Sequence, residues 1–129
     1  MATLNRRSLL ALFGIATVAG RASAARSARP PVVLLRTHVN GEAYYEAAEI
    51  ASTLRAGTPL TLRREPDNAY DRRAIEVLDA AGRKLGYVPR SDNPAVARMM
   101  DAGERMRASV TDVRVLTCDI RMVVEWLPG

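Results

Sequence analysis

Residues 58–88 read TPLTLRREPDNAYDRRAIEVLDAAGRKLGYV, and this stretch decides the fold. Thr58–Arg64 alternates apolar and polar side chains, the period-2 pattern of a half-buried strand, and Ala74–Leu78 does the same. Asp79–Gly82 then supplies the turn of a hairpin that leads into Lys84–Val88. Three consecutive strands of this kind predict an antiparallel sheet at the centre of the domain.

The elements before this centre follow from similar patterns. Val32–Val39 is rich in aliphatic and β-branched residues and is predicted to be the first strand. Tyr45–Ala56 has small and aliphatic residues at helical spacing, and Gly57 follows as a stop signal, so a helix of about two or three turns is expected. The residues that this helix is expected to bury are Ala47, Ile50, Ala51 and Leu54.

The last third of the chain predicts a second helix and two more strands. Ser91–Pro94 is a helix-start signal, a capping side chain followed by proline at the first helical position. Arg105–Leu116 and Thr117–Leu127 are predicted to be strands. This order of elements predicts a small, mostly antiparallel β-barrel or rolled sheet flanked by two short α-helices. The apolar stripe of the second helix, in which the methionines are interpreted as core filler, consists of Ala95, Val96, Met99 and Met100.

Residues 1–24 have the three parts of a signal peptide. The basic pair Arg6 and Arg7 precedes an uncharged stretch, and small residues end at Ala24, the predicted cleavage site. The uncharged stretch is shorter than the roughly 20 residues that span a bilayer. We therefore expect a periplasmic or secreted protein with no stable membrane anchor after cleavage; an uncleaved anchor is the weaker alternative. Residues 25–31 are expected to form a disordered leader before a domain that spans 32–127.

The arginine pair and the residues after it resemble the twin-arginine export motif of bacteria. Asn5 and Leu9 depart from the preferred residues of that motif, so the general secretory route stays open. Removal of Arg6, Arg7 and Arg21 lowers the 19 basic residues to 16 against 14 acidic ones, an excess of +2 instead of +5. Such a small excess does not guarantee the dense basic face of a non-specific nucleic-acid binder.

Residue types needed for catalysis or metal binding are scarce. Cys118 is the only cysteine, so no internal disulfide or C-x-x-C pair forms, and it is expected to be a buried small hydrophobe. His38 is the only histidine, which excludes a Cys/His zinc site, and no G-x-S-x-G elbow accompanies it. Glu65, Asp67 and Asp71 suggest an acid-base group or a cation site, but flanking arginines neutralise them. We predict no catalytic residue, no metal site and no cofactor, and an enzyme is the weakest interpretation.

The connection within the central stretch is unusually rich in polar residues. Asp67, Asn68 and Asp71 suit a tight turn, because short polar side chains hydrogen-bond the backbone. This does not explain Tyr70 within the same turn. All four tyrosines lie at the ends of predicted elements, where rings are half exposed; for any one of them alone, core packing is the ordinary interpretation.

Several short motifs, taken together and in order, resemble the HIRAN domain from about Val32 to Trp126. The motifs are Gly41-x-x-Tyr44-Tyr45, then Leu60-x-Leu62-x-Arg64-Glu65-Pro66-Asp67-Asn68-x-Tyr70-Asp71-x-x-Ala74-Ile75-x-Val77, then Gly86-Tyr87-Val88-Pro89-Arg90. The resemblance implies a compact β-barrel related to oligonucleotide-binding (OB) barrels, with two helices. The expected fold class is therefore mostly β, a small antiparallel OB-like barrel with two short α-helices.

The resemblance also implies recognition of single-stranded DNA at a free 3′ hydroxyl end. Tyr44 and Tyr70 would stack on terminal bases, Asn68 and Asp71 would hydrogen-bond the terminal nucleotide, and Arg90 would lie near a phosphate. The nucleic-acid-binding residues that it implies are Tyr44, Tyr45, Asn68, Tyr70, Asp71, Tyr87 and Arg90. Hydrolase and zinc-binding attributes of larger family members belong to attached domains.

Three positions depart from the DNA-binding members of the family. Ala69 stands where proline is usual, Ala43 where those members have arginine, and Tyr87 where they have histidine. The main alternative is an exported module without catalytic activity that binds a periplasmic protein or peptide with the same tyrosines.

Overall fold

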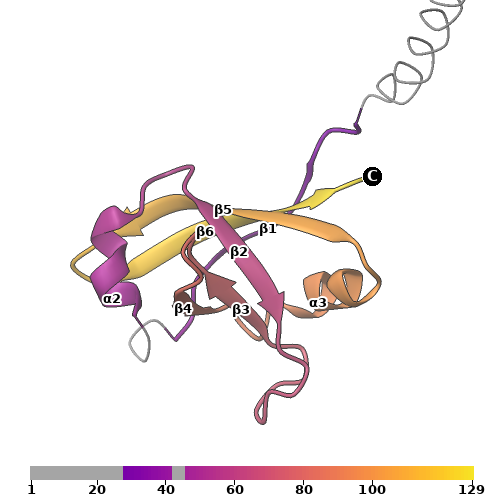
Figure 1. Ribbon diagram of the computed structural model, residues 1–129, viewed down its shortest axis with the longest axis horizontal. Helices are drawn as coiled ribbons and strands as arrows, with labels where there is room; N and C mark the ends of the chain where they lie inside the picture. Colours follow the sequence, from indigo (N-terminus) through magenta and orange to yellow (C-terminus); the bar gives the residue numbers. More distant parts are fainter. Residues whose placement is uncertain (1–27, 42–45) are drawn as a thin grey trace, which may run out of the picture.

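A computed structural model describes residues 28–41 and 46–129, and these contain six strands and three short helical segments (Figure 1). The predicted signal peptide and the first three residues of the predicted leader (25–27) lie outside the described residues, as do Tyr44 and Tyr45. The elements are β1 (Val32–His38), α2 (Ala47–Ile50), the 3-10 helix η2 (Ala51–Thr53), β2 (Pro59–Arg64), β3 (Ile75–Leu78), β4 (Lys84–Tyr87), α3 (Pro94–Asp101), β5 (Arg105–Arg114) and β6 (Asp119–Leu127).

The six strands form one antiparallel sheet in the order β1-β6-β5-β2-β3-β4. The sheet curls so that its two edges meet just beyond β1. There Asn40 and Tyr87 exchange backbone hydrogen bonds, each N–H donating to the other carbonyl at 2.8 Å. The predicted fold class, a small antiparallel OB-like barrel with two short α-helices, is confirmed.

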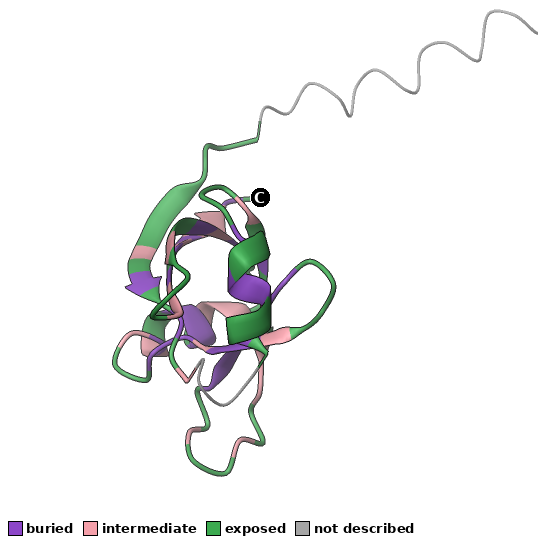
Figure 2. Cartoon of the chain, turned by 90° about the vertical axis from the view of Figure 1, so that its left-hand side faces the viewer, coloured by how far each residue is buried: buried purple, intermediate pink, exposed green. Residues whose placement is uncertain are grey.

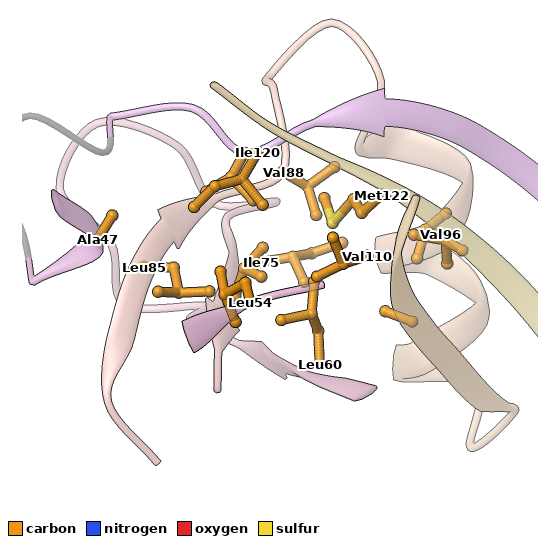
Figure 3. Close-up of a cluster of buried hydrophobic side chains, with 14 of the residues drawn as sticks. Ala47, Leu54, Leu60, Ile75, Leu85, Val88, Val96, Val110, Ile120 and Met122 are labelled. Atoms are coloured by element: carbon orange, nitrogen blue, oxygen red, sulfur yellow. The ribbon is translucent and has the colours of Figure 1, made fainter. Parts of the chain in front are cut away.

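The apolar side chains gather inside the curled sheet (Figure 3). Strand residues contribute most of this core, and the helices α2 and α3 add a few side chains from the two sides. Ile75, Leu85, Ile120 and Met122 are completely buried. The alternation read from the sequence therefore corresponds to the inner face of the sheet, and Leu60 and Leu62 point inward as expected.

Gly86 allows the closure of the sheet. Its φ is +155°, and a Cβ atom at this position would lie 2.4 Å from the carbonyl oxygen of Asn40. Glycine is the residue that permits such a close backbone approach. The strand β4 therefore meets the end of β1 only because position 86 has no side chain.

The first predicted helix is shorter than expected. Of Tyr45–Ala56, the helical part is α2 and η2, which end at Thr53, because the Thr53 hydroxyl bonds the carbonyl of Ile50 at 2.6 Å and Leu54 turns to an extended conformation. The predicted buried positions are nevertheless correct: Ala47, Ile50, Ala51 and Leu54 are all buried. Among the described residues, no helix is long and apolar enough to cross a membrane.

Two strand predictions need correction. All four residues of β3 are buried instead of alternating, because Glu76 is covered and paired with Arg63 at 2.6 Å and Lys84 at 3.3 Å. The last two strands are shorter than predicted, since a turn over residues 115–118 joins them. Cys118 closes this turn with a φ of 52° and is half-buried against the core, so the prediction of full burial was wrong.

The second helix begins at Pro94, the predicted first position. The predicted capping is wrong, because the side chain of Asn93 makes no hydrogen bond to the helix and contacts Asp71 instead. The apolar stripe is also shifted: Val96 and Ala97 are buried, whereas Ala95 is exposed. The two methionines are half-buried, and Met100 packs against the core, in agreement with its interpretation as core filler.

Candidate nucleic-acid interface

The β2–β3 loop (residues 65–74) projects from one end of the sheet (Figure 1), and Arg64 helps to hold its base. Arg64, whose side chain is only 14% exposed, donates to the carbonyl of Ala74 at 2.6 Å and to that of Arg72 at 2.9 Å. Its guanidinium also forms a fork with Asp101 of α3, at 2.9 and 3.2 Å. Arg64 therefore fixes the second half of the loop, which contains Arg72 and Ala74, to both β2 and α3.

A polar network around Glu65 supports the first half of the loop. The Glu65 carboxylate accepts hydrogen bonds from the side-chain amide of Asn68 at 2.8 Å and from the Tyr87 hydroxyl at 3.0 Å. Lys84 donates to the Tyr87 hydroxyl at 2.6 Å and lies 3.8 Å from Glu65. The pKa of Glu65 is lowered, first by a hydrogen bond with the Glu76 carboxyl and then by Asn68, Tyr87 and Lys84, against an opposing effect of burial.

Asn68 organises the tip of the loop. Its side-chain oxygen accepts from the backbone N–H groups of Tyr70 at 2.9 Å and Asp71 at 3.0 Å, which is an Asx turn. Its amide nitrogen donates to Glu65 and, at 3.4 Å, to the Tyr87 hydroxyl. An asparagine side chain offers two donors and two acceptor lone pairs. All four are used within the protein, so Asn68 acts on the loop conformation.

The carboxylate of Asp71 faces a hollow between the loop and the start of α3. One oxygen accepts from the backbone N–H of Arg73 at 2.9 Å, and the other accepts from the side-chain amide of Asn93 at 2.7 Å. Burial is the largest single effect on its pKa and raises it. The two hydrogen bonds and the charges of Arg90 and Arg73 together outweigh burial, so the pKa of Asp71 is lowered. The group is therefore an anion that accepts hydrogen bonds.

Tyr70 stands at the tip of the loop with 89% of its surface exposed. The loop as a whole consists of exposed and half-buried residues apart from Ala74 (Figure 2). Two adjoining hollows of about 480 and 500 Å³ lie beside the loop. The residues that line both hollows are Asn68, Ala69, Tyr70, Asp71 and Arg90.

The structure thus brings five of the seven predicted binding residues together. Asn68, Tyr70, Asp71, Tyr87 and Arg90 surround the two hollows, and Arg90 lies on the connection between β4 and α3. The other two lie outside the described residues. Tyr87 contributes to the wall of the second hollow, while its hydroxyl belongs to the Glu65 network.

Three residues that hold this region together were not among the predicted binding residues: Arg64, Glu65 and Asn93. Arg64 appeared only as part of a motif, and Glu65 only in that motif and in the suggested acid-base or cation group. No sequence pattern indicates that an arginine bonds two carbonyls of a loop eight to ten residues away. Asn93 carried a signal that was misread, because an asparagine before a proline is typical of a helix cap. Among the residues that the structure describes, no group of three or more His, Cys, Asp or Glu side chains is placed to hold a metal ion.

Comparisons with known proteins identify the fold. The crystal structure of a protein from Lactobacillus plantarum aligns with a TM-score of 0.72 and 33% identity, over 78% of this chain and 98% of that chain. The crystal structure of the HIRAN domain of human HLTF aligns with a TM-score of 0.62 and 24% identity, over 77% of this chain and 81% of that one. The structure of the HLTF HIRAN domain in its DNA-bound conformation aligns with a TM-score of 0.52 and 23% identity, over 77% and 80% of the two chains.

A curated relative and a family model agree with these structures. The helicase-like transcription factor of Oryctolagus cuniculus is 36% identical over 67 residues, which are 52% of this chain and 6% of that protein. The chain therefore spans only a small part of that relative. The model of the HIRAN domain family matches residues 32–126. The chain belongs to the HIRAN domain family.

Proposed function

We propose that this protein binds nucleic acid, and specifically the free 3′ hydroxyl end of single-stranded DNA, in the hollows beside the β2–β3 loop. The observation that carries the proposal is the arrangement of Asp71 next to Tyr70, an ionised hydrogen-bond acceptor beside an exposed ring. Membership of the HIRAN family supports it, and the HIRAN domain of HLTF has a structure in a DNA-bound conformation.

The exposed ring of Tyr70 suits base stacking. A ring that is 89% exposed contributes little to the core and offers both faces to a ligand. Stacking of a base on an aromatic side chain contributes roughly 1 to 3 kcal/mol and tolerates any sequence. We assign Tyr70 to the terminal base. Tyr44 and Tyr45 remain proposed partners for the neighbouring bases, and Tyr44→Ala is expected to weaken binding in the same way.

The carboxylate of Asp71 suits a terminal hydroxyl better than a terminal phosphate. An ionised carboxylate has about four lone-pair sites and no donor. Two of these sites are taken by Arg73 and Asn93, so others are available for a ligand that donates. A 3′ hydroxyl donates such a bond, whereas a 3′ phosphate has only acceptor oxygens and a like charge, which is repelled.

Cationic side chains beside Asp71 suit the phosphates further along the strand. Arg72, Arg73 and Arg90 line the hollow that contains the carboxylate, and all three are exposed. Each contact between an arginine and a phosphate releases counterions, so binding should weaken as salt rises. Asn68 and Tyr87 are proposed to act indirectly, because their polar groups already hold the loop.

Fluorescence anisotropy with two otherwise identical short single strands tests this function. One strand ends in a 3′ hydroxyl and the other in a 3′ phosphate. We expect the hydroxyl strand to bind more tightly and Asp71→Asn to remove most of the difference, whereas Asp112→Asn, which changes an exposed carboxyl of β5 that lines neither hollow, retains it. Equal affinities for both strands, falling together with rising salt, would contradict the proposal.

Export is a separate proposal that rests on residues 1–24, outside the described part of the chain. The expected result of N-terminal sequencing is a mature protein that begins at Ala25 in a periplasmic or secreted fraction. An intact chain found only in the cytoplasm would contradict export, without affecting the proposed binding site.

A further inference from the structure

Asn93 occupies the capping position of α3 without capping the helix. A residue at this position ordinarily places its side-chain oxygen on a backbone N–H of the first turn. Asn93 makes no such bond; only its backbone carbonyl takes part in the helix, accepting from Ala97 at 2.9 Å. Its side chain is turned instead toward the β2–β3 loop, 22 residues earlier in the sequence, and is 1% exposed.

The side chain of Asn93 makes one strong contact and leaves one atom without a partner. Its amide nitrogen donates to Asp71 at 2.7 Å, a short distance that is typical of a charge-assisted hydrogen bond. Its oxygen is buried and accepts no hydrogen bond from the described residues. The reverse orientation of the amide would place this oxygen against the carboxylate, so the chemistry fixes the nitrogen on Asp71.

Buried polar atoms without a partner are rare and reduce stability. A capping conformation would give the Asn93 oxygen a partner in the first turn of α3, yet the structure has the side chain on Asp71. Sites where a local rule of stability is broken in favour of one specific contact are typical of functional sites. The contact with Asp71 therefore calls for an explanation other than stability of the helix.

We propose that Asn93 is a positioning residue for the Asp71 carboxylate: its amide fixes one carboxylate oxygen, so that the remaining lone pairs are directed at the terminal hydroxyl of a bound strand. This inference rests on the proposed function and adds a residue from a second element to it. The backbone N–H of Arg73 holds the other oxygen, so the carboxylate is held from both sides. Neither Arg73 nor Arg90 can take over the hydrogen bond of Asn93 unless its side chain moves, because neither side chain donates a hydrogen bond to Asp71 in the structure.

The substitution Asn93→Ser separates this role from a merely structural one. Serine is as good a capping residue as asparagine, but its hydroxyl is too short to reach Asp71. We expect Asn93→Ser to keep or raise the thermal stability, because the buried oxygen without a partner disappears. We expect its preference for the 3′ hydroxyl strand over the 3′ phosphate strand to fall about tenfold, the effect of losing one hydrogen bond to a charged group.

The experiment measures the affinities of both strands for the wild type, Asn93→Ser and Pro94→Ala. Pro94→Ala alters the start of α3 and leaves the contact between Asn93 and Asp71 in place, so it is expected to retain the preference. A second readout, the titration midpoint of the Asp71 carboxyl measured by NMR without any ligand, is expected to rise in Asn93→Ser. It is expected to stay unchanged in Pro94→Ala.

The outcomes distinguish failure of the proposed role of Asn93 from failure of the proposed DNA binding. If Asn93→Ser keeps the preference of the wild type, or if its Asp71 midpoint does not move, Asn93 is not a positioning residue. If the wild type itself shows no preference between the strands, the proposed function fails. In that case the titration alone decides whether Asn93 controls the Asp71 carboxylate: a raised midpoint in Asn93→Ser supports this, and an unchanged one contradicts it.

Discussion

The side-chain amide of Asn68 donates a 2.8 Å hydrogen bond to the carboxylate of Glu65, three residues earlier in the same loop. The oxygen of the same side chain receives the backbone N–H groups of Tyr70 and Asp71. Glu65 in turn is held by Tyr87 and Lys84 of β4. The sheet thus determines, through two side chains, where the loop places its exposed ring and its carboxylate.

Asn68→Asp should disturb this connection in a pH-dependent way. Aspartate keeps the acceptor for the two backbone N–H groups but places a second carboxylate oxygen against Glu65. We expect the free energy of unfolding to fall by about 1 to 3 kcal/mol near neutral pH, because a donor is lost and like charges meet. The difference from the wild type should shrink near about pH 4, where carboxyls begin to be protonated. Urea denaturation at the two pH values measures it; equal stability of variant and wild type at both would show that the amide donor is unimportant.

Tyr70→Ala should affect binding and spare the fold. Because the side chain is 89% exposed, the change in unfolding free energy should stay within about 0.5 kcal/mol. Loss of one stacking platform of roughly 1 to 3 kcal/mol corresponds to a weakening of single-stranded DNA binding by about fivefold to 150-fold. Leu116→Ala is the matched control, since Leu116 is fully exposed on the turn between β5 and β6. An equal loss of affinity in both variants, or no loss in Tyr70→Ala, would show that the Tyr70 ring does not contribute to binding.

Gly86→Ala should destabilise the closed sheet. An alanine Cβ would lie 2.4 Å from the Asn40 carbonyl oxygen, and the backbone φ of +155° is unfavourable as well. We expect a loss of about 3 kcal/mol or more from overpacking and backbone strain together. Gly82→Ala provides the comparison, because that position also has a positive φ, +82°, but no atom within 4 Å of the added Cβ. Its cost should be about 1 to 2 kcal/mol. Similar denaturation midpoints for the two variants would contradict the role of Gly86 in closure.

Acid should destabilise the protein through Glu65 and Asp71. Both carboxyls have a lower pKa in the folded chain than their ordinary values of about 4.3 and 3.9. Their contribution to stability is therefore fully present above these values and is lost as the pH falls through the lower folded pKa values. We expect nearly constant unfolding free energy from about pH 7 to 5 and a decline below about pH 4. The decline should be less steep in Asp71→Asn, and identical acid profiles of the two proteins would show that Asp71 makes no such contribution.

Sequence patterns were sufficient for the sheet because apolar side chains recur at the period of a strand. Leu60, Leu62 and the β3–β4 hairpin were placed correctly on this basis. Glu76 was misplaced because its burial depends on Arg63 and Lys84, which only the folded sheet brings to it. The closure of the sheet through Asn40 and Tyr87 could not be predicted from the sequence either, because a backbone bridge between distant residues leaves no periodic pattern.

The candidate site also has a part that the sequence predicts and a part that it does not. Asn68, Tyr70 and Asp71 lie within four residues of one another, so a motif was enough to find them. Asn93 comes from another element, and its local sequence favoured the wrong role, a helix cap, because the competing partner Asp71 is remote in sequence. Local preference predicts the capping of a helix well only where no stronger distant partner competes for the side chain.

The most direct test of the central claim is an NMR titration of the isotope-labelled protein with a short single strand that ends in a 3′ hydroxyl. The claim predicts that the largest shifts of backbone amide signals fall on residues 68–73 and on Arg90, and that the same strand with a 3′ phosphate produces clearly smaller shifts there. Shifts concentrated elsewhere, for example on the turn over residues 115–118, or identical shifts with both strands, would contradict it.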